Sequence, residues 1–181
     1  MKWLIASDIH GSLPWAKALF ERFEAEKADR MLLLGDLFYH GPLSGPPEGY
    51  DPQAVRELLM AHRTDFLTVR GNTESEAVQF VMDFPCMAEY ALLDVNGHVI
   101  FAHHGHNFHE ENMPPLRPGD VLLAGHTHVP ALEDRGGILY MNPGSAALPL
   151  GGSERGYMTL EDGLFSWKTM DGKTWQTYRI S

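Results

Sequence analysis

The stretch that decides the fold is residues 2–12, which read Lys2-Trp3-Leu4-Ile5-Ala6-Ser7-Asp8-Ile9-His10-Gly11-Ser12. The apolar first half is typical of a buried strand. This strand ends at a carboxylate and an imidazole two residues apart, Asp8 and His10, and a glycine follows at once. A strand end is rigid and the turn after it is open to solvent. We therefore expect a metal site where this strand ends.

The chain up to Asn72 alternates between helix and strand patterns. Helices are expected to begin where a Ser or Asp cap precedes a proline in the first turn, at Ser12-Leu13-Pro14 and at Asp51-Pro52. Strands are expected at 31–34 and 66–69, and they end at Asp36 and Asn72. Because a helical crossover joins parallel strands, the three strand ends should lie at the same edge of one sheet.

The rest of the chain is mostly of strand type. A short helix is expected at 75–82, and a hairpin turns at Asn96-Gly97, the strongest short signal for that motif. Further strands are expected at 121–124, at 137–141 and, as two or three antiparallel strands, within 156–180. Two sheets packed face to face, with helices outside, would bury all of these apolar strands.

The composition excludes some classes of function. The 181 residues suffice for one domain, 1–181, with a full hydrophobic core. The formal net charge is -10 and there is no basic run, so a strong grip on duplex nucleic acid is not expected. No apolar stretch is long enough to span a membrane. The single Cys86 excludes an internal disulfide, which favours a cytoplasmic location.

Side chains that bind metal ions recur where the expected strands end. They are Asp8, His10, Asp36, Asn72, His104, His126 and His128. Imidazole and carboxylate without thiolate suit Mn, Fe, Zn, Co or Ni. Seven ligands exceed the need of one ion, whereas one bridging carboxylate and three further ligands on each side make two four-ligand sets. The sequence therefore predicts a two-metal hydrolase, whose cations would offset the repulsion between an acidic protein and a phosphate.

Each motif is weak alone, but the order of the motifs is specific. They are Asp8-x-His10, Gly35-Asp36, Gly71-Asn72, His104-Gly105-His106 and Gly125-His126-Thr127-His128. Together they resemble the motif set of the calcineurin-like metallophosphoesterase superfamily. The chain length, the loop 142–145 and the segment 40–50 narrow the resemblance to the small YfcE-like bacterial phosphodiesterases. The resemblance extends from Asp8 to the C-terminal strands.

The resemblance implies a fold and a reaction. The fold would be α/β (α+β), a four-layer αββα sandwich of two mixed β-sheets flanked by helices. The reaction would be hydrolysis of a small phosphodiester by a hydroxide shared between two divalent transition-metal ions, with manganese favoured over Fe, Zn, Ni or Co. The implied ligand sets are Asp8, His10 and His128 for one ion and Asn72, His104 and His126 for the other, with Asp36 bridging them.

One position departs from the wider superfamily. Many members carry His directly after the Gly-Asn pair, where it is proposed to protonate the leaving group, but this chain has Thr73. We expect His106 to act in its place, or else to support a metal ligand. His40, Arg70 and Thr73 are candidates for contact with the substrate, against the alternatives of a plain loop residue for His40 and a solvated side chain for Arg70. His103 is expected to be structural.

Two other functions stay open. A phosphomonoesterase or nucleotidase would use the same site, and the ratio of activities on bis-nitrophenyl phosphate and nitrophenyl phosphate separates it from a diesterase. A non-catalytic scaffold, like the retromer subunit of this fold, is expected to depart at Asp36 and Asn72, and both are intact here. The expected partner is a small phosphorylated substrate, without membrane or duplex nucleic acid. A homo-oligomer is compatible with the sequence.

Overall fold

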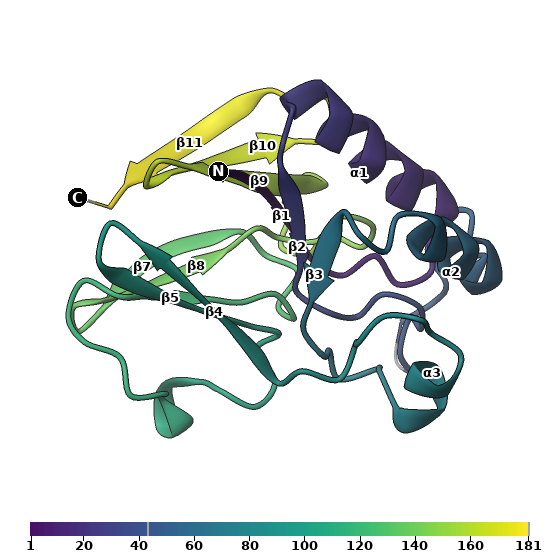
Figure 1. The fold of residues 1–181 in the computed structure, drawn as a ribbon, viewed down its shortest axis with the longest axis horizontal. Helices are drawn as coiled ribbons and strands as arrows, with labels where there is room; N and C mark the ends of the chain where they lie inside the picture. The colour runs from purple at the N-terminus through teal and green to yellow at the C-terminus, as the bar shows by residue number, and fades with distance from the viewer. Residues whose placement is uncertain (43, 181) are drawn as a thin grey trace.

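The protein consists of two mixed β-sheets packed face to face (Figure 1). The computed structural model describes residues 1–42 and 44–180. Leu43, in the segment 40–50, and Ser181, the last residue of the expected domain, lie outside the described residues. The first sheet has β1 (Lys2–Ala6), β2 (Arg30–Leu33), β3 (Phe66–Thr68), β9 (Gly156–Glu161), β10 (Leu164–Thr169) and β11 (Thr174–Arg179), in the order β11-β10-β9-β1-β2-β3.

The second sheet has five strands within the described residues. They are β4 (Tyr90–Val95), β5 (His98–His103), β6 (Val121–Leu123), β7 (Ala131–Arg135) and β8 (Ile138–Asn142), in the order β4-β5-β6-β8-β7. The helices are α1 (Leu13–Glu26), α2 (Pro52–Ala61), α3 (Glu76–Phe80) and the 3-10 turn η1 (Glu110–Asn112). The two mixed sheets with flanking helices confirm the expected fold class.

Parallel pairing brings the strand ends to common edges. In the first sheet β1 pairs with β2 and β2 with β3, all parallel, because α1 and α2 provide the crossovers. In the second sheet β5, β6 and β8 are parallel neighbours. The carboxyl ends of these strands therefore lie side by side in each sheet, which is where α/β proteins place their ligands.

The period-two pattern of β1 decides which side chains enter which core. Leu4 belongs to the cluster beneath α1, with Leu19 and Phe20. Its neighbour Ile5 points to the opposite face and joins the cluster between the sheets. The outer face of the second sheet is covered by Phe108, Met113 and Leu116, from the segment between β5 and β6 that holds η1. The two sheets thus pack against each other, against the helices and against this segment.

Two local details differ from the sequence-based expectation. Strand β7 was not expected, because Ala131–Arg135 is short, rich in charge and lies at the edge of its sheet. The hydroxyl of Ser12 does not cap α1; it donates to the carbonyl of Glu48, 2.6 Å away. By contrast, Asp51 caps α2 as expected, since its Oδ1 accepts the N–H of Ala54.

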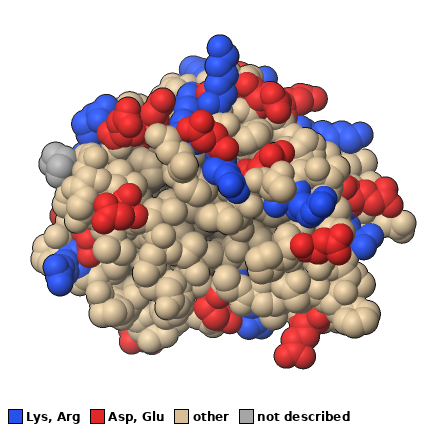
Figure 2. Space-filling view, in the orientation of Figure 1, with Lys and Arg blue, Asp and Glu red and all other residues tan. Residues whose placement is uncertain are grey.

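The surface carries charges of both signs. On the face drawn in Figure 2, Lys and Arg side chains are interspersed with Asp and Glu and do not gather into a stripe. Among the described residues, no helix combines the length and the hydropathy that crossing a membrane requires.

Candidate metal centre

Five strand ends from the two sheets converge on one site. Asp8 and His10 follow β1, Asp36 follows β2 and Asn72 follows β3 in the first sheet. His104 follows β5, and His126 and His128 follow β6 in the second sheet. Interatomic distances below 4 Å link most of these residues into two groups. All seven candidate ligands expected from the sequence therefore lie at the meeting edges of the sheets.

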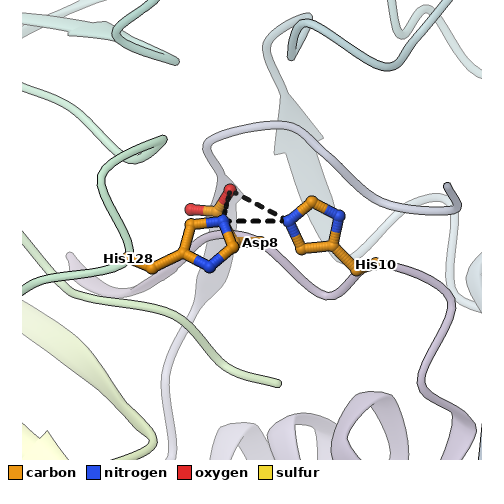
Figure 3. Close-up of side chains that lie close together, drawn as sticks. All are labelled: Asp8, His10 and His128. Carbon is orange, nitrogen blue, oxygen red and sulfur yellow. Dashed lines mark hydrogen bonds and ion pairs between the residues drawn. The ribbon is translucent and has the colours of Figure 1, made fainter. Parts of the chain in front are cut away.

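The first group consists of Asp8, His10 and His128, whose side chains point toward one another (Figure 3). Asp8 Oδ1 lies 3.5 Å from His10 Nε2 and 3.3 Å from His128 Nε2. The two Nε2 atoms are 3.1 Å apart. Asp8 is fully buried, and its Oδ1 has no hydrogen-bond partner within the described residues.

These separations fit one metal ion. Bonds of ~2.1 Å from a tetrahedral cation to N and O ligands place the ligand atoms roughly 3.4 Å from one another. The three distances within the first group agree with that spacing. A buried carboxylate oxygen without a hydrogen-bond partner is costly in a folded protein unless a cation is its partner. The donor set of one carboxylate and two imidazoles suits a divalent transition metal.

Backbone carbonyls orient three of the imidazoles. The Nδ1–H groups of His10, His104 and His128 donate to the carbonyls of Tyr39, Leu34 and Leu148, at 2.6, 2.7 and 2.6 Å. Because Nδ1 carries the proton in these bonds, Nε2 is the nitrogen left to bind a cation. This is the outer support that histidine ligands of metals usually have.

Asp36 lies between the first group and a second one. Its Oδ2 is 3.7 Å from His10 Nε2 and 3.5 Å from His104 Nε2. Its Oδ1 accepts both the N–H and the hydroxyl of Thr73, each at 2.9 Å. One carboxylate oxygen is thus held by Thr73, and the other faces an imidazole from each group.

The second group is more open than the first. Asp8, Asp36 and His104 offer ligand atoms within 4.8 Å of one another, and Asn72 Oδ1 lies 2.9 Å from His104 Nε2. His126 is exposed; its ring centroid is 5.0 Å from that of His104. Its backbone N–H donates to Asp8 Oδ2 at 3.0 Å. His126 therefore lies at the rim of this group, close to His104.

Five of the seven candidate ligands have a left-handed backbone. The φ angles are 60° for Asp8, 49° for His10, 53° for Asp36, 67° for His126 and 59° for His128. This conformation is uncommon for residues other than glycine and costs about 1–2 kcal/mol at each position. Such residues cluster at functional sites.

Glycines let the ligand turns approach one another. A Cβ on Gly71 would overlap the backbone N and Oδ1 of Asp36, and a Cβ on Gly125 would overlap Ser7 Oγ. A Cβ on Gly35 would overlap the backbone of Gly71. The glycines before Asp36, Asn72 and His126 are therefore packing requirements, which explains the Gly-Asp, Gly-Asn and Gly-His pairs of the sequence.

Glu74 is a buried acid that the sequence did not single out. It is 2% exposed, and its carboxylate accepts the backbone N–H groups of Asp36, Leu37 and Gly71 at 2.9, 2.8 and 2.7 Å. Burial, together with the charge of Asp36, raises its pKa. Glu74 ties the turn after β2 to the turn after β3. Its signal in the sequence is weak, since an acid two residues after Asn72 is ordinary in a loop.

The last residue of β8 and the loop after this strand support the first group. Ser145 Oγ donates to the carbonyl of Asp8 at 2.9 Å. Asn142 Nδ2 donates to the carbonyl of Gly125 at 2.7 Å. Both residues are buried, and they link the turn after β1 and the turn after β6 to β8.

Electrostatics keep the carboxylates charged. Burial favours the neutral acids, but the imidazoles of His10 and His128 hold the pKa of Asp8 far below its ordinary value, and His104 lowers the pKa of Asp36. For His104, burial is outweighed by Asp36 and Asp8, which raise its pKa to about 9. A cation that binds at His104 must therefore displace a proton.

His106 and His103 differ in their surroundings. Burial lowers the pKa of His106, whose ring centroid lies 5.4 Å from that of His104 and 6.3 Å from that of His126. It is half-buried at the mouth of the site. His103 is buried between Phe101 and Phe108, and burial lowers its pKa to about 3. This packing agrees with the structural role expected for His103.

The three candidates for substrate contact already have partners. Arg70 Nη1 forms an ion pair with Glu89 Oε1 at 2.9 Å. His40 Nδ1 donates to the carbonyl of Ser44 at 2.7 Å. The hydroxyl of Thr73 is bound to Asp36, so this residue positions a ligand in the structure.

Known proteins resemble this chain in sequence and in fold. Residues 1–162 match the model of the calcineurin-like phosphoesterase superfamily domain. Phosphodiesterase YfcE of Escherichia coli strain K12 is 42% identical over 168 residues, which cover 92% of this chain and 90% of that protein. The solved structure of Yfce, described as a phosphoesterase from E. coli, has a TM-score of 0.94 and 39% identity, with all of both chains covered. Vps29 of Entamoeba histolytica, solved with zinc, has a TM-score of 0.62 at 18% identity over all of both chains and shares the fold alone.

Proposed function

Because the chain belongs to the calcineurin-like phosphoesterase superfamily, we propose that this phosphoesterase hydrolyses a small phosphodiester at a centre of two divalent metal ions. We infer phosphodiesterase activity because the relative that is 42% identical to this chain is named phosphodiesterase YfcE. The observation that carries the two-ion centre is Asp36 Oδ2, which faces Nε2 of His10 at 3.7 Å and Nε2 of His104 at 3.5 Å. One carboxylate oxygen between two ligand groups is suited to bridge two cations.

The ligand sets proposed are those expected from the sequence. They are Asp8, His10 and His128 for one ion, Asn72, His104 and His126 for the other, and Asp36 for both. Manganese is the first choice, and Fe, Zn, Ni and Co suit the same donors. When bound, the ions supply Lewis-acid chemistry: they lower the pKa of the attacking water and offset the charge that develops on the phosphoryl oxygens.

Side chains of the protein would orient the ester and supply the proton that the departing oxygen takes up. In the hydrolysis, water adds to phosphorus, the P–O bond to one alcohol breaks, and the departing oxygen takes up a proton. We propose that His106 donates this proton, since its ring lies at the mouth of the site beside His104 and His126. Asn72 would hold a phosphoryl oxygen as well as a metal ion through its short amide side chain.

Arg70 and His40 are proposed to bind the substrate on opposite sides. The guanidinium of Arg70 is about one-third exposed and only one of its nitrogen atoms pairs with Glu89 in the described structure, so it can still face a phosphate oxygen. His40 belongs to the segment that borders His10.

A cytoplasmic location, expected from the single Cys86, and a homo-oligomer both stay predictions, as does the absence of a duplex nucleic acid partner.

The activity and the bridging role can be tested together. Wild-type protein is expected to hydrolyse bis-nitrophenyl phosphate faster than nitrophenyl phosphate, and the reverse order would indicate a phosphomonoesterase. Asp36→Asn is expected to lose at least 100-fold in turnover while remaining folded by circular dichroism. Unchanged hydrolysis by Asp36→Asn would refute the bridging role. If the metal-loaded wild type hydrolyses neither substrate, the result would refute the proposed enzyme and favour the non-catalytic scaffold.

A further inference from the structure

Three aromatic side chains of the segment 39–50 form a continuous group beside the first ligand set. The ring centroids of Tyr39 and His40 are 4.9 Å apart, and those of His40 and Tyr50 are 5.0 Å apart in an edge-on arrangement. The hydrogen bond from His40 Nδ1 to the carbonyl of Ser44 holds the middle ring. We call Tyr39, His40 and Tyr50 the aromatic wall.

The wall is joined directly to a candidate metal ligand. The carbonyl of Tyr39 accepts the Nδ1–H of His10 at 2.6 Å. At the other end, the ring of Tyr50 lies over Gly11, since a Cβ there would come within 2.7 Å of Tyr50 Cε2. Both ends of the wall therefore contact the turn 8–11 that carries Asp8 and His10.

Hydrogen bonds fix the Tyr50 end of the wall to the turn that starts α1. Residues 48–51 are hydrogen-bonded to the turn that starts α1: Ser12 Oγ donates to Glu48 O at 2.6 Å, Leu13 N to Gly49 O at 3.1 Å, and Asp51 N to Gly11 O at 2.8 Å. A binding surface that is already ordered loses less conformational entropy on binding, so its contacts contribute more to affinity.

The outermost ring of the wall is free to stack. Tyr39 is 44% exposed although it is a large aromatic residue. The other side of the site is different in character, because Arg70 and Asn107 both bind Glu89 there and His106 lies close by. One side is thus aromatic and rigid, and the other is charged and able to donate a proton.

We propose that Tyr39 stacks on an aromatic group of the substrate, so that the ester group retained on phosphorus is an aryl group or a nucleoside. This inference rests on the proposed function. The leaving alcohol faces His106, which protonates it, and the retained group faces the wall next to His10. Stacking of a base on an aromatic side chain contributes about 1–3 kcal/mol, which corresponds to a factor of roughly 5–150 in affinity.

The test varies the retained group and keeps the leaving group constant. Wild type, Tyr39→Leu and Tyr39→Phe are loaded with Mn²⁺ and assayed on three phosphodiesters. Each has one p-nitrophenyl group as the leaving group, and the retained group is phenyl, thymidine (linked through its 5′ oxygen) or methyl. Wild type should show a KM at least five-fold lower for the phenyl or thymidyl ester than for the methyl ester. Tyr39→Leu should remove that difference with kcat changed less than two-fold, and Tyr39→Phe should keep it. Trp175→Leu, at a distant exposed aromatic residue of β11 that is 49% exposed, is the control and should match wild type.

The outcomes separate the inference from the proposed function. An equal KM for all three esters in the wild type, or an unchanged preference in Tyr39→Leu, would refute stacking on Tyr39. The proposed phosphodiesterase function would be unaffected by either result. No hydrolysis of any of the three esters overturns the proposed function and the wall with it. A KM lower for the thymidyl than for the phenyl ester identifies a nucleoside as the retained group, and equal values for the two identify any planar aryl group.

Discussion

The substitution Glu74→Gln tests how the ligand turns are held together. Glutamine has the size of glutamate and keeps one oxygen, which can take the place of Oε2 and accept the N–H groups of Asp36 and Gly71. The amide NH2 then occupies the position of Oε1, where it faces the N–H of Leu37. One hydrogen bond is lost and two buried donors oppose each other.

The size of the effect follows from these contacts. A hydrogen bond to a charged acceptor contributes about 1.5–3 kcal/mol, and its loss leaves the N–H of Leu37 unsatisfied. Removal of a buried charge that lies near Asp36 offsets part of this loss, since burial and Asp36 disfavour the ionised form of Glu74. The net loss in the free energy of unfolding should be about 2 kcal/mol. For a chain of this length that lowers Tm by about 4–8 °C.

The assay has two readouts. Thermal unfolding in a chelator reports the stability of the metal-free protein, and calorimetric titration with Mn²⁺ reports the affinity of the centre. Because Glu74 orients the turn of Asp36, the affinity for Mn²⁺ should fall about 10-fold or more. Glu76→Gln is the matched control, since Glu76 is exposed in the first turn of α3 and should change neither quantity. A Glu74→Gln protein with the Tm and the Mn²⁺ affinity of the control would refute the positioning role.

Three further predictions concern other parts of the chain. His106→Ala should reduce turnover about 100-fold on an alkyl leaving group and much less on nitrophenolate, with metal content unchanged; equal losses would contradict a role as proton donor. Burial opposes the ionisation of Glu26, but the charges of Lys168 and Lys2 lower its pKa below the ordinary value of 4.5. Its stabilising effect, about 1–2 kcal/mol, should therefore be complete above pH 4.5 and disappear as the pH falls through the lowered pKa, so Glu26→Gln and wild type should converge in stability in acid but differ at pH 7. Burial raises the pKa of the Cys86 thiol to about 11, so the native protein should resist iodoacetamide at pH 8 and react once unfolded; rapid labelling of the native state would contradict the buried position.

Much of the fold could be predicted because local patterns agree with tertiary packing. The alternation in β1 separates Leu4 from Ile5 between two cores, as a period of two requires. The Asn96-Gly97 turn joins β4 to β5 as expected, and both of its residues have positive φ, 56° and 82°. Strand β7 was missed because a short charged edge strand is held by its neighbour, β8, and local propensity gives little sign of it.

The candidate ligands could be predicted from the sequence, but the residues that position them could not. His10 and His128 follow strands, and a strand end is visible in the sequence. The carbonyls of Tyr39 and Leu148 that orient the two imidazoles come from other loops, so this support depends on tertiary structure. Glu74 belongs to the same class, because an acid that accepts three backbone N–H groups resembles any loop acid until the chain is folded.

Metal counting tests the central claim most directly. Protein stripped with a chelator is titrated with Mn²⁺, and bound metal per chain is measured beside the hydrolysis of bis-nitrophenyl phosphate. Two groups of ligands that share Asp36 predict two bound ions per chain, no hydrolysis in the stripped protein, and full hydrolysis only when both ions are bound. Saturation at one ion per chain, or hydrolysis by the stripped protein at the rate of the loaded protein, would contradict the two-metal centre.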